Sequence, residues 1–421
     1  MTGTVQPPRA NEPSRPGASP RSVEQWLASL SGPGELGTLL AVPWEEQLRL
    51  GYGHTVREIA QQPLTWLETT AALRALRSVV EESLDGVGAV VVTGSGSSVY
   101  AAECVAPCLQ RSLRLPVSAV PAGLILTHPD SCLPPTGPFV VVSLARSGDS
   151  PESRTVVDDL LESRPQARHL FITCNRDGAL ATCYRDRPGV RTIVLDEKTN
   201  DRSLVMTSSF TNLVLAGRAL AGDPEACERR GALLADAASD LLRQHAGEIA
   251  RTARRGFRSA VYLGSGCRLG SAREAALKML EMNAGEVSTF AESYLGLRHG
   301  PMSGIRPDTL VVAFLSSDPL VRAYELDLLR ELDRKALGAG RVVVGSSLAR
   351  GIVAADDALL LDCGRAPSAD EDLTLLDAVV GQLLAFFRCL AAGYRPDSPS
   401  QDSVITRVVS DFVIHRRNGG R

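Results

Sequence analysis

The sequence predicts an α/β protein with two doubly wound parallel-sheet domains in tandem, preceded by a helical lead-in. Short Val-rich runs alternate with polar loops and helical patterns, which is typical of strands buried on both faces of a parallel sheet. The series recurs about 170 residues later along the chain, and such a period indicates a duplicated domain. When the two halves of the sequence are aligned at this offset, the glycine-rich turn at residues 94–96 matches the turn at residues 264–266.

Two segments precede these domains. Residues 1–21 are polar and rich in Pro, so they bury too little apolar surface to offset the entropy of ordering, and we expect a disordered N-terminus. Residues 22–84 carry helical spacing, with Trp26, Leu27 and Leu30 on one stripe. We expect this lead-in to form helices that pack on the part of the chain that follows.

The first domain is predicted over residues 85–247. Each of its βα units begins with an apolar run and continues through a polar loop or turn. These stretches are residues 87–106, 137–161, 168–183 and 190–198. Helical spacing then extends from Asn200 to Glu248, so helices should connect the two domains.

The second domain is predicted over residues 248–400. Its expected strands lie in the stretches 260–276, 310–318, 340–347 and 358–364. A strongly apolar helix follows at residues 373–390, and residues 401–421 form a polar C-terminal tail.

Composition narrows the class of ligand. The formal net charge is −3 and the pI is near 6.1, whereas nucleic acids and anionic membranes both require a basic face. We therefore expect neither partner and favour a small molecule. The nine cysteines are scattered without a CxxC pair, and the first 20 residues lack the apolar run of a signal peptide or membrane span, so we expect a cytoplasmic protein with reduced thiols. No cofactor and no metal is expected, because the His and Cys residues are too dispersed to suggest ligands.

One short stretch gathers groups suited to proton transfer. Glu274, Lys278 and Glu281 stand at positions i, i+4 and i+7 of a predicted helix and therefore share one face. His299 follows in a turn bounded by Gly and Pro, and an imidazole can carry a proton near neutral pH. The alternative interpretation is a solvated helix face with an i, i+4 ion pair.

Two loops of the first domain are rich in hydroxyl groups. In open α/β sheets ligands bind at the carboxyl ends of the strands, beside helix N-termini. The first loop, TGSGSS, supplies Ser97 and Ser98. The second loop, ARSGDSPES, supplies Ser147 and Ser150. Together these loops favour a dianion such as a phosphate, with plain helix capping as the alternative for each.

Other features of the polar segments give weaker evidence about the ligand. The first loop lacks the third Gly of a dinucleotide fingerprint and neither loop contains GK[ST], so nucleotide binding is disfavoured. The matching loops of the second domain, GSGCRLG and LSSDP, keep fewer hydroxyls. A polar cluster at residues 199–212 includes Ser208 at the start of a helix, where turn and cap chemistry competes with substrate contact as the explanation.

These features resemble the sugar isomerase (SIS) domain family, whose members include the isomerase half of glucosamine-6-phosphate synthase. The closer resemblance is to the AgaS group of tagatose-6-phosphate ketose/aldose isomerases, also described as galactosamine-6-phosphate deaminases. It is carried over residues 50–415 by the motifs ARSGDSPES, NDRSLVMTSSFTN, LGLRHGP, VVAFLSSDP and ITRVVSDFVIH. The resemblance implies two flavodoxin-like SIS domains and a homodimer or higher homo-oligomer with a shared active site.

The resemblance also implies a role for each candidate residue. Glu281 resembles the base that moves a proton between C1 and C2, and Lys278 lies one turn before it. His299 resembles the histidine that assists ring opening and is donated across a dimer interface. The implied phosphate-binding residues are Ser97, Ser98, Arg146, Ser147 and Ser150, and the further candidates for substrate contact are Gly96, Ser208 and Arg298.

Some positions depart from the family pattern. Ala145 replaces the first hydroxyl of the SxSGx[ST] stretch, and Met302 stands where a basic residue is expected after HGP. The spacing from Glu281 to His299 is also longer than in the synthase. No lysine follows Lys335, so a Schiff base on a C-terminal lysine is excluded.

The function implied is an aldose–ketose isomerase for sugar phosphates that also deaminates a 2-amino-2-deoxyhexose 6-phosphate. Because water would convert a ketimine intermediate into the ketose, we expect the activity to be classed with the hydrolases as well as the isomerases. Two alternatives remain open at this point. One is a ketose/aldose isomerase without deamination, and the other is a non-catalytic sugar-phosphate sensor.

Overall fold

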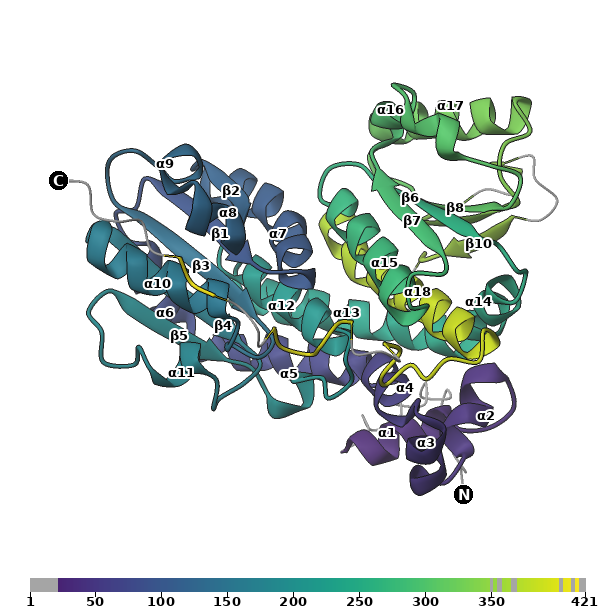
Figure 1. The fold of residues 1–421 in the computed structure, drawn as a ribbon, viewed down its shortest axis with the longest axis horizontal. Coiled ribbons are helices and arrows are strands. Elements are labelled where there is room, and N and C mark those ends of the chain that lie inside the picture. Colours follow the sequence, from purple (N-terminus) through teal and green to yellow (C-terminus); the bar gives the residue numbers. More distant parts are fainter. Residues whose placement is uncertain are drawn as a thin grey trace, which may run out of the picture.

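The computed structural model contains two five-stranded parallel sheets, each flanked by helices (Figure 1). It describes residues 22–348, 351–353, 358–364, 369–400, 404–409 and 413–415, so the expected disordered segment 1–21 and part of the expected tail 401–421 lie outside the described residues. The strand order is β2-β1-β3-β4-β5 in the first sheet and β10-β9-β8-β6-β7 in the second. When the second sheet is read from β7 to β10, its strands follow the same order along the chain as those of the first sheet. The prediction of two tandem doubly wound domains is confirmed.

The helical lead-in is also confirmed. Its helices are α1 (Val23–Leu30), α2 (Glu35–Ala41), α3 (Trp44–Leu50), α4 (Gly53–Ala60), α5 (Gln62–Arg74) and α6 (Arg77–Leu84). Trp26 and Trp66 are buried in the same hydrophobic cluster as strands β1 and β3. The lead-in therefore shares a hydrophobic core with the first sheet, while its helices α2 and α4 also pack against α14 and α18.

The first sheet and its connections span most of the N-terminal half. The strands are β1 (Ala89–Gly94), β2 (Val117–Pro121), β3 (Phe139–Ala145), β4 (Ala167–Thr173) and β5 (Val190–Val194). The helices are α7 (Ser97–Leu113), α8 (Ala122–Thr127), α9 (Pro129–Cys132), α10 (Pro151–Ser163) and α11 (Ala179–Thr182). The helical connection to the second sheet is made by α12 (Ser208–Ala219), α13 (Pro224–Asp240), a π-helical turn (Leu241–His245) and α14 (Ala246–Ala253).

The second sheet repeats this arrangement. Its strands are β6 (Ser259–Leu263), β7 (Ser288–Glu292), β8 (Thr309–Phe314), β9 (Gly340–Gly345) and β10 (Leu359–Asp362). Its helices are α15 (Arg268–Met282), α16 (Tyr294–Leu297), α17 (Pro319–Arg334) and α18 (Asp370–Ala391). In both copies the turn glycine, Gly96 or Gly266, has a φ of 56°, so the duplicated turns share their backbone conformation.

Strands β2 and β7 were missed by the sequence analysis. Each lies at an edge of its sheet and is only five residues long. One residue of β2 is fully buried and none of β7 is, so neither strand shows the continuous apolar run that marks a central parallel strand. Both sheets therefore have one more strand than the apolar runs predicted.

Helix α18 is, among the described residues, the one helix long and apolar enough to cross a membrane. However, 89% of its most apolar window is buried inside the structure. It packs against α14 and α15, so it serves as a core helix of the second domain.

Helix α15 lies between α7 of the first domain and α18 of the second (Figure 1). Two glycines allow this close packing. A Cβ added at Gly270 would lie 2.8 Å from Cys104 Sγ on α7, and one added at Gly381 of α18 would lie 2.4 Å from Ala275 Cβ. The position of α15 relative to the first sheet is therefore fixed by contacts between helix backbones.

We expect Gly270→Ala to lower the free energy of unfolding by about 1–3 kcal/mol, because the added methyl overpacks the contact of α15 with α7. Chemical denaturation of the variant and the native protein measures this difference. Gly123→Ala is the matched control, because a Cβ at Gly123 meets no atom within 4 Å. Equal destabilisation by both substitutions would contradict this account of the contact.

Candidate active site

The acidic and basic groups of α15 form a buried cluster. Lys278 and Glu274 are fully buried, and Lys278 Nζ lies 3.5 Å from Glu274 Oε1. Lys278 Nζ also donates a hydrogen bond to a carboxylate oxygen of Glu281 and another, of 3.1 Å, to Ser97 Oγ at the start of α7. The shared helix face is confirmed, and the alternative of a solvated face is wrong because two of the three groups are excluded from water.

The charges within this cluster depend on one another. Burial raises the pKa of Glu274 to about 7, although the positive charge of Lys278 opposes the shift. Burial works against the charged form of Lys278 too, but Glu274 and Glu281 outweigh it and raise the pKa of the lysine above its ordinary value. Lys278 is therefore a permanent cation at neutral pH, held directly beside the carboxylate of Glu281.

The two hydroxyl-rich loops lie at the carboxyl ends of β1 and β3. Ser97 and Ser98 open α7 immediately after Gly96. In the second loop, Ser147 Oγ accepts a hydrogen bond of 3.2 Å from its own loop, at the N–H of Asp149. Ser150 precedes Pro151 at the start of α10 but caps no backbone N–H with its side chain. Helix capping therefore does not account for the hydroxyl of Ser150.

A single cavity of about 470 Å³ joins these loops to α15. Glu281 reaches it from the second domain, with 22% of its side chain exposed. The other predicted site residues that line it are Gly96, Ser97, Ser98, Arg146, Ser147 and Ser150. The structure thus brings the predicted phosphate loops and the predicted base together around a space large enough for a hexose phosphate.

Arg146 lines the cavity but directs its guanidinium at backbone carbonyls. It donates to Ser203 O and Leu204 O at 3.3 and 3.0 Å, and to Arg407 O at 2.8 Å. Burial and the nearby charge of Arg407 lower the pKa of Arg146. These contacts join the loop before α12 to the C-terminal segment, so Arg146 helps to form the cavity wall.

The C-terminal segment 404–409 forms another wall of the same cavity. Arg407 donates to Asp201 O and to Asn200 Oδ1, which holds the segment against the first domain. Upstream, Asp397 accepts hydrogen bonds from the first turn of α4, at Thr55 N (2.7 Å) and His54 N (3.2 Å). In Figure 1 the yellow chain after α18 accordingly crosses back to the first sheet.

The contribution of residues 404–409 to the cavity wall differs from the expectation that residues 401–421 form a polar tail. The segment has no periodicity that predicts burial. The signal that could have found it is the ITRVV sequence within the C-terminal family motif, because a tail with no role has no reason to carry such a motif.

Four predicted residues do not line this cavity: Lys278, which is fully buried beside Glu281, and three others. Ser208 is fully buried, and its hydroxyl donates to Asp201 Oδ1 at 2.5 Å. Arg298 pairs with Glu331 at 2.8 Å. His299 is exposed in the turn after α16. Within one chain, therefore, the histidine is not part of the candidate site.

Comparisons with known proteins identify similar chains and structures. No family model matches the chain. An AgaS protein from Streptomyces coelicolor is 38% identical over 376 residues, which cover 87% of this chain and 96% of that protein. D-galactosamine-6-phosphate deaminase AgaS from Escherichia coli is 34% identical over 368 residues, covering 86% and 95% of the two chains. The crystal structure of tagatose-6-phosphate ketose/aldose isomerase from Escherichia coli has 33% identity and a TM-score of 0.77, with 82% of this chain and 95% of that chain covered.

The tandem sheets and the cavity between them define a two-domain SIS protein of the sugar-phosphate isomerase and deaminase class. The chain belongs to the AgaS family. The expectation that it is also classed as a hydrolase is wrong, because the similar proteins are named as a deaminase and as a ketose/aldose isomerase.

Proposed function

We propose that this chain converts galactosamine 6-phosphate into tagatose 6-phosphate and ammonia by proton transfer between C1 and C2. The observation that supports this most is the shared cavity, in which the phosphate loops of the first domain face Glu281 of the second. A non-catalytic sensor would need the loops but not a carboxylate held by a buried lysine. The names of the relatives also favour an enzyme.

The proposed reaction begins with the open-chain aldose phosphate. Its phosphate binds the loops that contain Ser97, Ser98, Ser147 and Ser150, where helix N-termini and backbone N–H groups favour a dianion. Glu281 removes the proton from C2 and leaves an enolamine. Return of that proton to C1, together with transfer of a proton from the C2 nitrogen to O1, gives a ketimine, which water converts to the ketose with release of ammonia. If C2 carries a hydroxyl, the corresponding proton transfers interconvert aldose and ketose.

Lys278 has two roles in this proposal. Its ammonium group donates a hydrogen bond to the Glu281 carboxylate and so holds this carboxylate in position in the cavity, as a base requires. Its hydrogen bond to Ser97 Oγ couples the base to the first phosphate loop.

We further propose that His299 enters the site from a second copy of the chain. The side chain is exposed and lies outside the cavity of its own chain, yet ring opening needs an acid or base near O1 and O5. A homodimer in which each copy supplies His299 to its partner explains the exposed position of His299 and also provides the acid or base that ring opening needs.

Mixing two inactive variants tests the shared site. Glu281→Gln and His299→Ala homodimers should each be inactive, and subunit exchange between them should restore activity, because one site of the heterodimer is then intact. Mixing each variant with itself is the control. Failure to regain activity, with exchange demonstrated by a mass tag, would show that His299 acts within its own chain or not at all.

The substrate is tested directly by incubating the native protein with galactosamine 6-phosphate, glucosamine 6-phosphate and tagatose 6-phosphate. Ammonia and ketose are followed together. Ammonia released from galactosamine 6-phosphate supports the proposal. Interconversion of tagatose 6-phosphate with an aldose, without ammonia from either amino sugar, would instead support the ketose/aldose isomerase activity named for the structural relative.

We expect Ser147→Ala and Ser150→Ala each to raise KM about 10- to 100-fold with a smaller effect on kcat, because a hydrogen bond to a charged phosphate contributes about 1.5–3 kcal/mol. Steady-state kinetics measure the two constants separately. Ser163→Ala, at the far end of α10, is the matched control. An unchanged KM in both loop variants would exclude this loop as the phosphate site.

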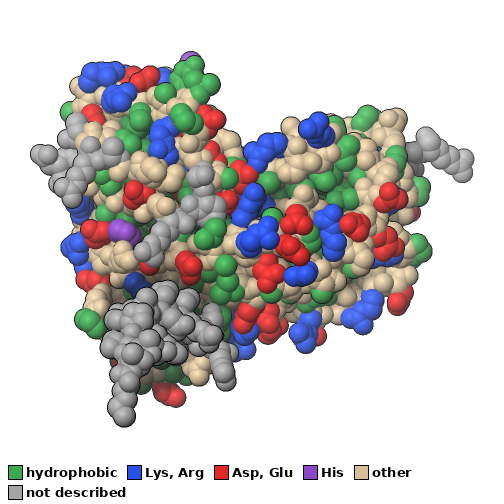
Figure 2. All heavy atoms as spheres, turned by 180° about the vertical axis from the view of Figure 1, so that it is seen from behind, with side chains coloured by type: hydrophobic (Ala, Val, Ile, Leu, Met, Phe, Trp, Pro, Cys, Tyr) green, Lys and Arg blue, Asp and Glu red, His purple; other side chains and the backbone are tan. Residues whose placement is uncertain are grey.

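A cytoplasmic location is part of the proposal. All nine cysteines are free thiols in the structure, and five of them are buried. Unpaired thiols are typical of a reducing compartment. On the face shown in Figure 2, basic and acidic side chains lie side by side, which agrees with a small-molecule ligand.

A further inference from the structure

The second sheet has a loop equivalent to the phosphate loop of the first. Strand β8 lies between β6 and β9 as β3 lies between β1 and β4. Residues 315–318 lead from β8 into α17, just as residues 146–150 lead from β3 into α10. Duplication therefore places a second potential anion site at the carboxyl edge of the second sheet.

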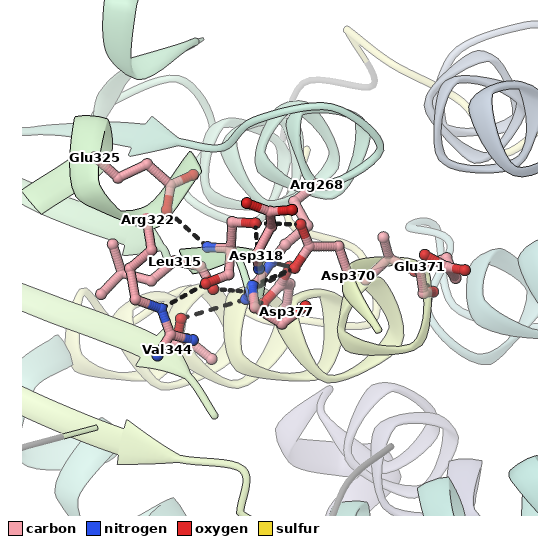
Figure 3. Close-up of polar contacts among 12 residues, drawn as sticks. Arg268, Leu315, Asp318, Arg322, Glu325, Val344, Asp370, Glu371 and Asp377 are labelled. Atoms are coloured by element: carbon pink, nitrogen blue, oxygen red, sulfur yellow. Dashed lines mark hydrogen bonds and ion pairs between the residues drawn. The ribbon is translucent and has the colours of Figure 1, made fainter. Parts of the chain in front are cut away.

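Two carboxylates already occupy this loop (Figure 3). Asp370, the first residue of α18, accepts hydrogen bonds from Ser317 N at 2.6 Å and from Ser316 Oγ. Glu325 of α17 accepts from Ser316 N at 2.7 Å. The donors that would hold an oxyanion are thus satisfied by side chains of the same chain.

A buried arginine completes this cluster. Arg268, which occupies the position of Ser98 in the duplicated turn, is fully buried and bonds both carboxylate oxygens of Asp377, at 2.8 and 2.5 Å. Its Nη1 also lies 4.0 Å from Asp370 Oδ1. Arg322 donates to Ser316 O at 2.6 Å (Figure 3). Asp370 therefore sits against backbone and hydroxyl donors with a cation nearby, as a bound anion would.

The contrast with the first domain is clear at the corresponding loop. There, no described carboxylate side chain accepts from the hydroxyl of Ser147 or of Ser150, and both residues line the open cavity. In the second domain the serine that matches Ser147, Ser317, donates its backbone N–H to the carboxylate of Asp370 at 2.6 Å. The same loop position thus faces a cavity in one copy and a carboxylate in the other.

We propose that the carboxylate of Asp370 is an internal ligand of a second anion site, so that this site is closed in the intact chain and opens to a small carboxylate anion when Asp370 loses its side chain. The site would take formate or acetate in place of the aspartate carboxyl group. Asp318, the other acidic residue of the loop, accepts from Leu320 N and Val321 N, and its charge therefore faces the N-terminus of α17. One consequence is that each chain has a single sugar-phosphate site, in the first domain.

Chemical rescue of the full-length protein tests this proposal. Asp370→Ala should lower Tm, and formate should restore Tm with a saturable dose response. Native protein and Glu371→Ala should respond only as they do to chloride at equal ionic strength. Glu371 is the matched control because it neighbours Asp370 in α18 but pairs with Arg111 of α7. Asp370→Asn should also lack the response, since its carboxamide still fills the site.

Two results would overturn the proposal. One is a formate response of Asp370→Ala no larger than that of Glu371→Ala, which would show only a general anion effect. The other is an equal response of Asp370→Asn, which would show that formate binds elsewhere. If Asp370→Ala is too unstable to purify, Asp370→Ser removes the same carboxylate and allows the same comparison.

Discussion

Replacement of Glu281 by Gln is expected to lower kcat by about 10²- to 10⁴-fold, the usual contribution of one positioned general base. The amide keeps the shape of the side chain and its place in the cavity but cannot accept the C2 proton. Because the phosphate loops are unchanged, the substrate should still bind with nearly native affinity. Ammonia and ketose formation measure kcat, and calorimetric titration with galactosamine 6-phosphate measures binding.

The matched control is Glu286→Gln. Glu286 is a surface carboxylate that pairs with Tyr394 after the end of α15 and does not line the cavity. Its substitution should leave kcat within a factor of about two, as for most surface changes. Native-like turnover by Glu281→Gln would remove the residue from the mechanism. Lost binding together with lost turnover would indicate a role in holding the sugar.

Lys278→Met is expected to affect both stability and catalysis. The substitution removes the only described cation within hydrogen-bond distance of the Glu281 carboxylate and leaves fully buried Glu274 without its ion pair. Breaking a buried ion pair from one side typically costs about 3–5 kcal/mol of folding free energy. Urea denaturation measures this loss, and catalytic activity should fall with it because Glu281 loses its orientation.

The pH dependence of this variant provides an internal check. With its pKa near 7, Glu274 binds its proton more tightly in the folded protein than in the unfolded chain, so its contribution to stability falls as pH rises from 4.5 to 7. Without Lys278 to offset the charge, that fall should be steeper. Lys278→Met should therefore be less destabilised at pH 5 than at pH 8. A loss of less than about 1 kcal/mol at both values would contradict the buried ion-pair account.

The repeated pattern of central strands was sufficient to predict the fold. In a central strand such as β3, where every residue is buried, the run of apolar residues is enough to predict the strand. Strands β2 and β7 lack that signal because Ser, Thr or Glu interrupts the apolar residues of their short sequences, VSAVP and STFAE. Their existence follows from pairing with β1 and β6, which no local pattern encodes.

Most of the candidate site was also predictable, since helix spacing places Lys278 beside Glu281 and the loops after parallel strands converge at one edge. The contribution of residues 404–409 to the cavity wall could not be predicted from the sequence pattern. It depends on contacts with Arg146 and Asp201, which are distant in sequence, and on the anchoring of Asp397 to α4. Likewise, the sequence around Ser208 predicted a helix start, but only the structure shows that Asp201 holds its hydroxyl.

The central claim is that one hexose phosphate contacts the loops of the first sheet and the carboxylate of α15 at the same time. A crystal structure of Glu281→Gln with galactosamine 6-phosphate tests it most directly. We expect the phosphate on Ser147 and Ser150, with C2 within about 3–4 Å of the residue 281 side chain. A phosphate bound away from both serines, or a C2 atom out of reach of residue 281 in every copy, would contradict the account.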